Sequence, residues 1–221
     1  MNVPWGTKRN LATKVNFVNE IIPFSIYGWF SGFKNLTTLI NLNNLNTKYC
    51  DNFGCVFEDC KKIKKLDLSI LDTSSMTSCD YLIGEGCELL EEVNLSGWDF
   101  SKVGYISIEF PDSVKKINLS NCIACSSFNE IVYPNEVETI DFTGFDSSRM
   151  TSMRNMFYSC YEITTLDLRS FDTSNINNFQ RAFFCCEKLE QILVGEKWAI
   201  DEGANTTQMF LNCKCSDVTH M

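Results

Sequence analysis

The chain has 221 residues, of which 44% are hydrophobic, and its 28 acidic residues outnumber its 19 basic ones. This length and composition are typical of one large domain that folds around a buried core. The formal charge of −9 and the lack of a long basic run argue against a nucleic-acid partner, because binding to a phosphate backbone depends on clustered lysine and arginine.

Residues 1–32 are expected to cap one end of the fold and to be helical in part. Four apolar residues recur there at helical spacing after Asn10, a suitable first residue for a helix: Leu11, Val15, Val18 and Ile22. Aromatic residues follow and could cover the first repeat: Phe24, Tyr27, Trp29, Phe30 and Phe33. The alternative is an amphipathic helix that binds a partner.

The apolar stretch at residues 21–30 is not expected to direct the chain to a membrane. It lacks a small-residue cleavage site, and Pro23 and Gly28 interrupt it. It is about ten residues long, whereas a membrane-spanning helix needs about twenty apolar residues. The sequence therefore predicts neither a signal peptide nor a membrane span, which favours an intracellular location or a place in an assembled particle over classical secretion.

An apolar-x-apolar triplet recurs along residues 33–214. The triplets begin at Ile40, Leu66, Val93, Ile117, Ile140, Leu166 and Ile192, which are 26, 27, 24, 23, 26 and 26 positions apart. Such a period is typical of a solenoid, in which each unit buries its apolar face by stacking on a neighbour. We expect an α/β solenoid of about seven turns, with one parallel strand per turn and short helices or irregular turns on the opposite side. Residues 215–221 are expected to form a tail, which leaves a sheet edge that could pair with another subunit.

Aspartate marks a turn shortly after four of the triplets. Asp72, Asp99, Asp146 and Asp172 each follow a large apolar residue and stand two positions before a serine. Short polar side chains of this kind hydrogen-bond nearby backbone amides, so we interpret these aspartates as caps and not as catalytic groups. Apolar residues then recur every three or four positions, which predicts a short helix or 3₁₀ turn, as at Met150, Met153, Met156 and Phe157.

Five of the 12 cysteines occupy one repeated position before the next triplet: Cys60, Cys87, Cys160, Cys186 and Cys213. In a stacked solenoid they would form an inward column, where a thiol behaves as a small buried hydrophobe. Disulfides between neighbouring turns are geometrically possible, since turns lie about 5 Å apart. Reduced, structural thiols are the preferred interpretation, because pairing five cysteines leaves one over.

The repeats resemble the BspA-type leucine-rich repeats, which include the 26-residue bacterial surface-protein repeat and a related mycoplasma lipoprotein domain of unknown function. Residues 150–174 and the closing Leu189 to Trp198 carry the resemblance, which extends over about residues 33–214. Residues 108–117 and 131–140 resemble a shorter sister repeat with Pro-x-x-Val-x-x-Ile, so the two central turns should have a plainer outer side. The resemblance implies a leucine-rich-repeat fold and a role in adhesion or protein contact at a surface, but no particular ligand.

Common catalytic signatures are missing from the sequence. The single histidine, His220, stands in the expected tail, so a base for a Ser-His or Cys-His nucleophile is not provided. Cys122 and Cys125 have the spacing of a redox dithiol or of half a zinc site, but no second pair completes four metal ligands. We therefore expect no cofactor, no metal and no enzyme activity, with a thiol-dependent activity of Cys122 and Cys125 as the remote alternative.

The outward face of the strands is the main candidate surface. Alternate residues of a strand point in opposite directions, so the polar residues around each buried position form outward columns. The candidate binding residues are Asn41, Lys65, Asp67, Glu92, Asn94, Lys116, Asn118, Asp141, Asp167 and Arg169. Two alternatives are a solvated sheet whose side chains hydrogen-bond along the stack, and weak Ca²⁺ binding by stacked carboxylates.

The leading functional hypothesis is a protein-interaction or adhesin-like module that binds a protein or glycan partner through its strand face or an end of the stack. The alternative is a structural component of a larger particle that is held by its edges.

Overall fold

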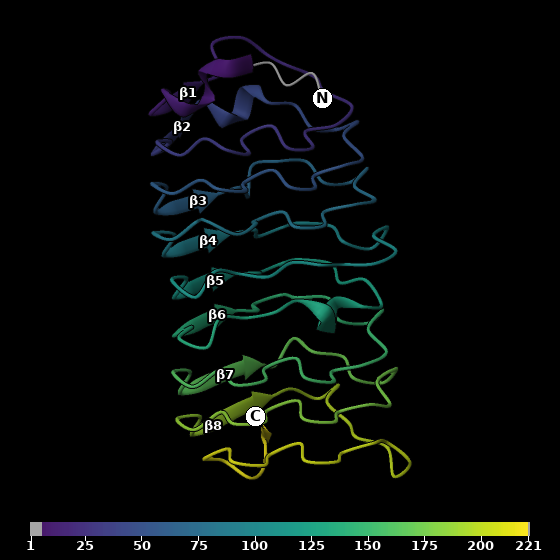
Figure 1. Cartoon of the computed structure of the whole chain (residues 1–221). Helices are drawn as coiled ribbons and strands as arrows, with labels where there is room; N and C mark the ends of the chain where they lie inside the picture. Colours follow the sequence, from purple (N-terminus) through teal and green to yellow (C-terminus); the bar gives the residue numbers. More distant parts are fainter. Residues whose placement is uncertain (1–5, 221) are drawn as a thin grey trace.

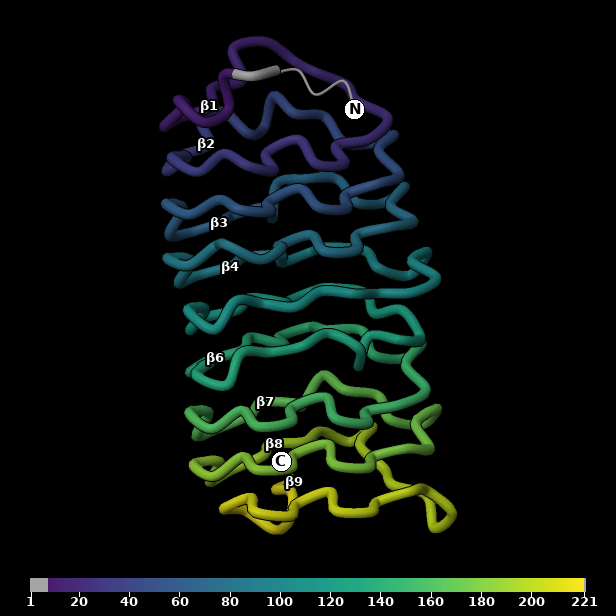
Figure 2. Tube along the Cα trace, in the orientation of Figure 1, coloured from purple at the N-terminus to yellow at the C-terminus, as the bar shows by residue number. Residues whose placement is uncertain are grey.

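The computed structural model describes residues 6–220 and shows a parallel β-solenoid of about eight turns (Figure 1). Each turn crosses the molecule and returns, and the strands lie above one another along one side (Figure 2). The strands are β1 Lys14–Asn16, β2 Thr38–Ile40, β3 Lys65–Asp67, β4 Glu92–Asn94, β5 Lys116–Asn118, β6 Thr139–Asp141, β7 Thr165–Leu168, β8 Gln191–Val194 and β9 Thr219–His220. Within residues 6–220, three short 3₁₀ helices accompany them: η1 Gly6–Asn10, η2 Leu42–Asn44 and η3 Phe128–Glu130.

The strands form three parallel sheets in sequence order: β1-β2, β3-β4-β5-β6 and β7-β8-β9. The register brings the middle residue of each strand against the middle residue of the next, so that Leu66 pairs with Val93 and Val93 with Ile117. These middle residues are at most 2% exposed, while their neighbours point outward. The alternation that the sequence predicts for these strands is therefore confirmed.

Backbone hydrogen bonds between turns also run along the side opposite the strands. In the regular turns, but not in the two shorter central ones, two positions there adopt a left-handed backbone conformation, as at Cys55 (φ 51°) and Asp59 (φ 55°). The amide of Cys55 donates to the carbonyl of Asp80 at 3.0 Å, and that of Asp59 donates to the carbonyl of Glu85 at 2.8 Å. The left-handed residues thus turn their amides toward the next turn, which satisfies backbone groups that the short turns leave unpaired.

Aromatic rings fill much of the core and stack from turn to turn. Phe157 lies 5.5 Å from Phe183 with nearly parallel rings, and Phe183 lies 5.4 Å from Phe210. Phe30 stacks on Phe57 in the same way at 5.1 Å. Because each repeat places its ring at the same position, the ring of one turn meets the ring of the next.

The N-terminal segment differs from the predicted helix. Residues 1–5 of the expected cap lie outside the described residues, and beyond η1 the chain forms β1, which pairs in parallel with β2. Val15 is buried, but Leu11 and Val18 are 83% and 72% exposed, so their helical spacing does not mark one buried face. A short isolated helix is marginally stable, and pairing with the neighbouring strand satisfies the backbone instead.

The outer turns are irregular where short helices were an alternative. After the Asp146 cap, the amide of Met153 donates to the carbonyl of Asn178, and that of Phe157 donates to the carbonyl of Ala182. These amides bond the next turn of the solenoid and not their own segment, so no helix propagates. His220, expected in a free tail, lies in β9 and pairs with Val194 of β8.

Candidate functional site

The strand face of β3 to β6 is hollowed into a shallow depression of about 380 Å³. Seven of the ten predicted binding residues line it: Lys65, Asp67, Glu92, Asn94, Lys116, Asn118 and Asp141. Thr139, which the prediction did not include, completes the outer column with Lys65, Glu92 and Lys116. Leu66, Val93 and Ile117, whose side chains are buried, form its floor. We call this surface the strand-face hollow.

The inner column of the strand-face hollow consists of Asp67, Asn94, Asn118 and Asp141, and its side chains hydrogen-bond the turns that follow the strands. The carboxylate of Asp67 accepts the amide of Ser69 at 3.2 Å, and the side-chain oxygen of Asn94 accepts the amide of Ser96 at 3.0 Å. Asn118 and Asp141 accept the amides two residues further along in the same way. Asn94 also donates its side-chain NH₂ to Asp67 at 2.9 Å. These residues therefore have a structural role whether or not they bind a partner.

The outer column carries charges that are balanced and accessible. Lys65 and Glu92 form an ion pair of 2.9 Å, and both side chains are more than a third exposed. The hydrogen bond from Lys65 lowers the pKa of the Glu92 carboxyl and raises the pKa of the Lys65 amine. Lys116, the next residue of the column, is exposed and close enough to Glu92 to favour its charged form further.

The other three predicted residues lie outside the strand-face hollow. Asn41 follows β2 in a left-handed conformation (φ 56°) and donates its side-chain NH₂ to Asn16 at 2.9 Å. It leaves the strand because Leu39, and not Ile40, pairs with the buried Val15. Asp167 lies in β7 of the next sheet, and Arg169 directly follows that strand. Arg169 Nε donates to Asp167 Oδ1 at 2.9 Å, and this contact lowers the pKa of the Asp167 carboxyl.

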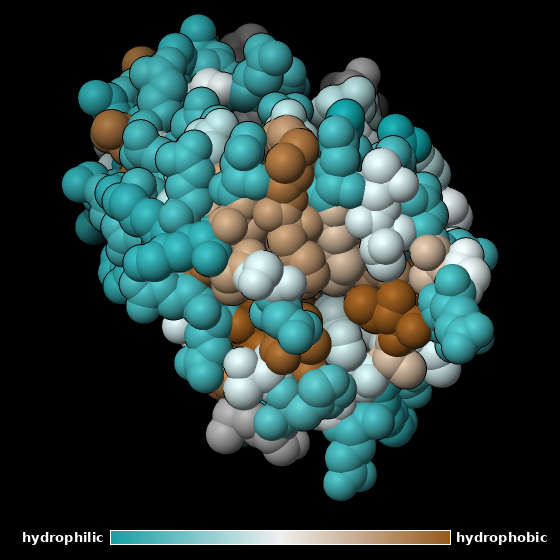
Figure 3. Space-filling model, turned by 90° about the horizontal axis from the view of Figure 1, so that it is seen from below, coloured by the Kyte–Doolittle hydropathy of each residue, from teal (hydrophilic) through white to brown (hydrophobic). Residues whose placement is uncertain are grey.

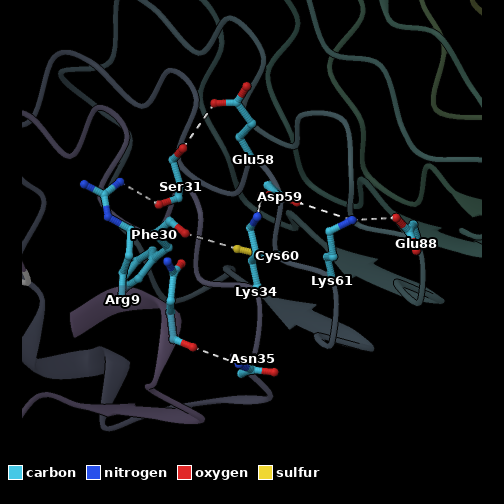
Figure 4. A network of polar contacts seen from close by, with 11 residues as sticks. Arg9, Phe30, Ser31, Lys34, Asn35, Glu58, Asp59, Cys60, Lys61 and Glu88 are labelled. Atoms are coloured by element: carbon cyan, nitrogen blue, oxygen red, sulfur yellow. Dashed lines mark hydrogen bonds and ion pairs between the residues drawn. The ribbon is translucent and has the colours of Figure 1, made fainter. Parts of the chain in front are cut away.

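Four of the five repeated cysteines lie in the core. Cys60, Cys87, Cys160 and Cys186 are at most 1% exposed, and Cys213 is half-buried. The thiol of Cys60 donates to the carbonyl of Phe30 at 3.2 Å, one turn earlier (Figure 4). Cys87 and Cys186 donate to the carbonyls of Phe57 and Phe157, both at 3.0 Å. All 12 cysteines are free thiols in the structure.

Cys122 and Cys125 are also core residues. Their exposures are 0% and 2%, and the Cys122 thiol donates to the carbonyl of Leu95 at 3.1 Å. Burial raises the pKa of the Cys122 thiol to about 12 and raises that of Cys125 as well. A reactive cysteine needs the opposite, namely a thiolate that is stabilised and reachable.

The sequence did not predict two larger hollows on the side opposite the strands. One, of about 530 Å³, lies where residues 81–86 meet residues 109–112, and the other, of about 570 Å³, lies where residues 129–135 meet residues 154–158. Each marks a junction between a regular repeat and one of the two shorter central repeats. Among the described residues, no backbone hydrogen bond joins residues 129–133 to residues 154–158, so the outer turns separate there. The only sequence feature that could have indicated these hollows is the drop in repeat spacing to 24 and 23 residues.

No helix within residues 6–220 is both long enough and apolar enough to cross a membrane. In the same part of the chain, no three histidine, cysteine, aspartate or glutamate side chains converge in a way that could hold a metal ion.

The stacked parallel strands and the polar strand-face hollow define the chain as a β-solenoid of the leucine-rich-repeat kind. Residues 24–124 and 126–219 match the family described as "Mycoplasma protein of unknown function, DUF285". The chain belongs to that family, because the two matched segments cover nearly the whole solenoid. No curated protein and no solved structure matches the chain.

Proposed function

We propose that this protein is a BspA-type interaction module that binds a macromolecular partner across its strand face and performs no catalysis. The observation that carries the proposal is the strand-face hollow, in which side chains from four consecutive strands converge. A shallow surface of this kind, open along its length, suits an extended partner that contacts several turns at once.

The chemistry of the hollow favours a polar ligand. Its outer column presents the amines of Lys65 and Lys116, the carboxylate of Glu92 and the hydroxyl of Thr139. Charges of both signs alternate, so no strongly charged partner is selected. A protein loop or a glycan, both rich in hydrogen-bond donors and acceptors, would complement it. Adhesion is the role that the family resemblance suggests for such binding.

The main argument against a thiol-dependent activity of Cys122 and Cys125 is the state of these two thiols. Cys122 and Cys125 are buried, and their raised pKa values keep them protonated near neutral pH. The single histidine lies exposed in β9, away from both.

The second candidate is a structural component of a larger particle, and an apolar area at the C-terminal end of the stack favours it. Seen along the stack, apolar atoms occupy the centre of that end and polar atoms surround them (Figure 3). Ile200 and Leu211 are 38% and 44% exposed there, and Phe210 and Val218 are only partly buried. Contiguous apolar surface of this kind is typical of contact with another protein.

The test places a photo-crosslinking amino acid at Lys116 or Thr139, in the outer column, and at the exposed Ser126 as a matched control. The outer column is chosen because substitution of Asp67 or Asn118 would also disturb a turn. In source cells, the two strand-face positions should yield the same adduct, and Ser126 should not. The paired reversal of Glu92 to Lys and Lys116 to Glu should abolish it. Equal adducts at all three positions, or adducts that survive the reversal, would refute the strand face as the binding surface.

A further inference from the structure

One column of side chains on the side opposite the strands changes character halfway along the stack. Its members each stand seven residues before the first residue of the next strand, from β3 to β8: Glu58, Glu85, Glu109, Val132, Tyr158 and Phe184. We call this column the outer edge. Its first three members are acidic and its last three are apolar, and a parallel bridge between Glu109 and Val132 joins the two halves.

The acidic half lacks positive partners. Glu58, Glu85 and Glu109 line the 530 Å³ hollow together with Asp112, and no basic side chain lines it. Within the described residues, no ion pair engages the three glutamates. Within the same residues, the carboxylate of Glu58 accepts one hydrogen bond, from the hydroxyl of Ser31 at 3.1 Å (Figure 4).

The residues beside the acidic half show the contrast. Asp59 is paired with Lys34 at 3.4 Å and with Lys61 at 3.7 Å, and Lys61 also reaches Glu88 at 3.0 Å (Figure 4). The adjoining surface therefore neutralises its own charge, but the outer edge does not. Carboxylates that line one hollow repel one another, and an external cation or guanidinium group would offset this repulsion.

The apolar half is flanked by positively charged side chains. Tyr158 and Phe184 stack with parallel rings 5.0 Å apart, and the guanidinium of Arg181 lies 5.4 Å from the Phe184 ring centre. Arg181 and Arg154 both line the 570 Å³ hollow, where Glu130 is the single acidic side chain. Among the described residues neither arginine takes part in an ion pair, and Arg181 donates from its Nε to the side-chain oxygen of Gln208 at 2.6 Å. Tyrosine and arginine on a hollowed surface are the residue types that dominate protein interfaces.

We propose that two copies of this protein pair through their outer edges, antiparallel, about a two-fold axis that passes between Glu109 and Val132. This pairing sets Glu85 of one copy against Tyr158 of the second, and Glu58 against Phe184. Arg154 and Arg181 then reach the glutamates of the opposite acidic half. Each contact occurs twice, as a two-fold interface requires.

The position of the two halves selects a second copy as the occupant. The acidic and apolar halves have three members each and lie at equal numbers of turns from the axis, so reversing one copy sets each acidic half against the apolar half of the other, beside which Arg154 and Arg181 carry the opposite charge. Guanidinium and carboxylate groups form strong, geometrically specific hydrogen bonds when water is excluded. The apolar rings and Val132, which is 52% exposed, supply the area that excludes it. This proposal is independent of the strand-face function.

The experiment measures mass by multi-angle light scattering over a concentration series. One variant carries Arg154→Glu and Arg181→Glu, and a second carries Glu85→Arg and Glu109→Arg. The matched control carries Lys62→Glu and Arg149→Glu, two exposed positions away from the outer edge that give the same change in net charge as the first variant. Circular dichroism checks that each variant is folded.

We expect the wild type and the control to approach twice 25.3 kDa at about 100 µM. Each edge variant alone should weaken dimerisation by about 100-fold, because like charges then face each other. An equimolar mixture of the two variants should dimerise again, since one now has two acidic halves and the other two basic halves. Raised salt should weaken the wild-type dimer.

Three results would overturn the proposal. They are a monomeric wild type at every concentration, an oligomer that is unchanged in both edge variants, and two monomeric variants that do not associate on mixing. Association through the apolar end of the stack would give an oligomer that is unchanged in both edge variants. Should a reversal variant fail to fold, the neutral pairs Arg154→Gln with Arg181→Gln and Glu85→Gln with Glu109→Gln replace it, and each should weaken the dimer.

Discussion

Two buried tryptophans offer a measurement of what one core hydrogen bond contributes to this solenoid. Trp98 is fully buried, and its Nε1 donates to the carbonyl of Leu68 at 2.9 Å. Trp198 is 5% exposed, and its Nε1 has no hydrogen-bond partner among the described residues. The substitution of each by phenylalanine removes a similar volume, so the pair differs mainly in the hydrogen bond.

The expected difference follows from the local geometry. The Leu68 carbonyl also accepts the amide of Leu71 at 3.1 Å, so Trp98→Phe removes one hydrogen bond without orphaning the acceptor, at a cost of about 1 kcal/mol. The lost volume adds about 1 to 2 kcal/mol in both variants. Trp198→Phe removes an unsatisfied buried donor, which offsets its volume loss by about 1 to 3 kcal/mol.

Trp98→Phe should therefore lower the free energy of unfolding by about 2 to 4 kcal/mol more than Trp198→Phe does. Urea denaturation followed by far-ultraviolet circular dichroism gives this difference and does not depend on tryptophan fluorescence. The reasoning fails if Trp198→Phe is as destabilising as Trp98→Phe. That result would mean that the indole of Trp198 has a partner, such as a bound water, or that volume loss alone governs both sites.

Three further outcomes are expected. Gly195→Ala should destabilise the fold by about 1 to 3 kcal/mol, because a Cβ there overlaps the Arg169 carbonyl oxygen, whereas Gly104→Ala, with open space around it, should change thermal stability little. Hydrogen bonds from Ser74, Ser148 and Ser174 lower the pKa of the Asp72, Asp146 and Asp172 carboxyls. Their stabilisation is complete above the ordinary aspartate pKa of about 4 and is lost as the pH falls through the lowered values. As the pH is lowered from neutral to acidic, the melting temperature of the triple Asp→Asn variant should therefore fall less than that of the wild type. An equal fall in both proteins would contradict this. Native alkylation with mass spectrometry should modify Cys55 and Cys185, which are partly exposed, before Cys87 and Cys160, and early labelling of the buried pair would contradict the thiol column.

Much of the fold could be predicted because each repeat shows the same local sequence pattern. The alternation around Leu66, Val93 and Ile117 identifies the buried face of each strand, and the structure follows it. The Asp caps are equally local, since Asp72 bonds the amide of Ser74 two residues on. These interactions depend on near neighbours in sequence, and a repeating pattern averages out ambiguity at any single position.

Features that depend on a single turn were harder to predict. Val15-Asn16-Phe17 at β1 is an apolar-x-apolar triplet with both apolar residues buried, but its Val15 also fits the helical spacing with Leu11 and Val18 on which the prediction relied. Only the pairing with β2 decides between the two. The register around Asn41 differs by one residue from the prediction, because Leu39 and not Ile40 pairs with Val15. Neither the hollows nor the outer edge could be derived from one turn, because they arise from how well two neighbouring turns fit.

The positions of the two outer hollows suggest why a regular repeat should contain irregular members. Identical turns produce uniform columns, and along the strand-face hollow the inner column is largely occupied in holding its own turns, as the bond from the Ser120 amide to Asn118 shows. A change of repeat type breaks the hydrogen bonding between outer turns and opens a concave surface that uniform stacking would close. The same change separates the acidic half of the outer edge, which ends at Glu109, from the apolar half, which begins at Val132. The two shorter turns would then serve as the centre of an interface, and the regular turns on either side as the rigid support that holds its two halves at equal distances from that centre.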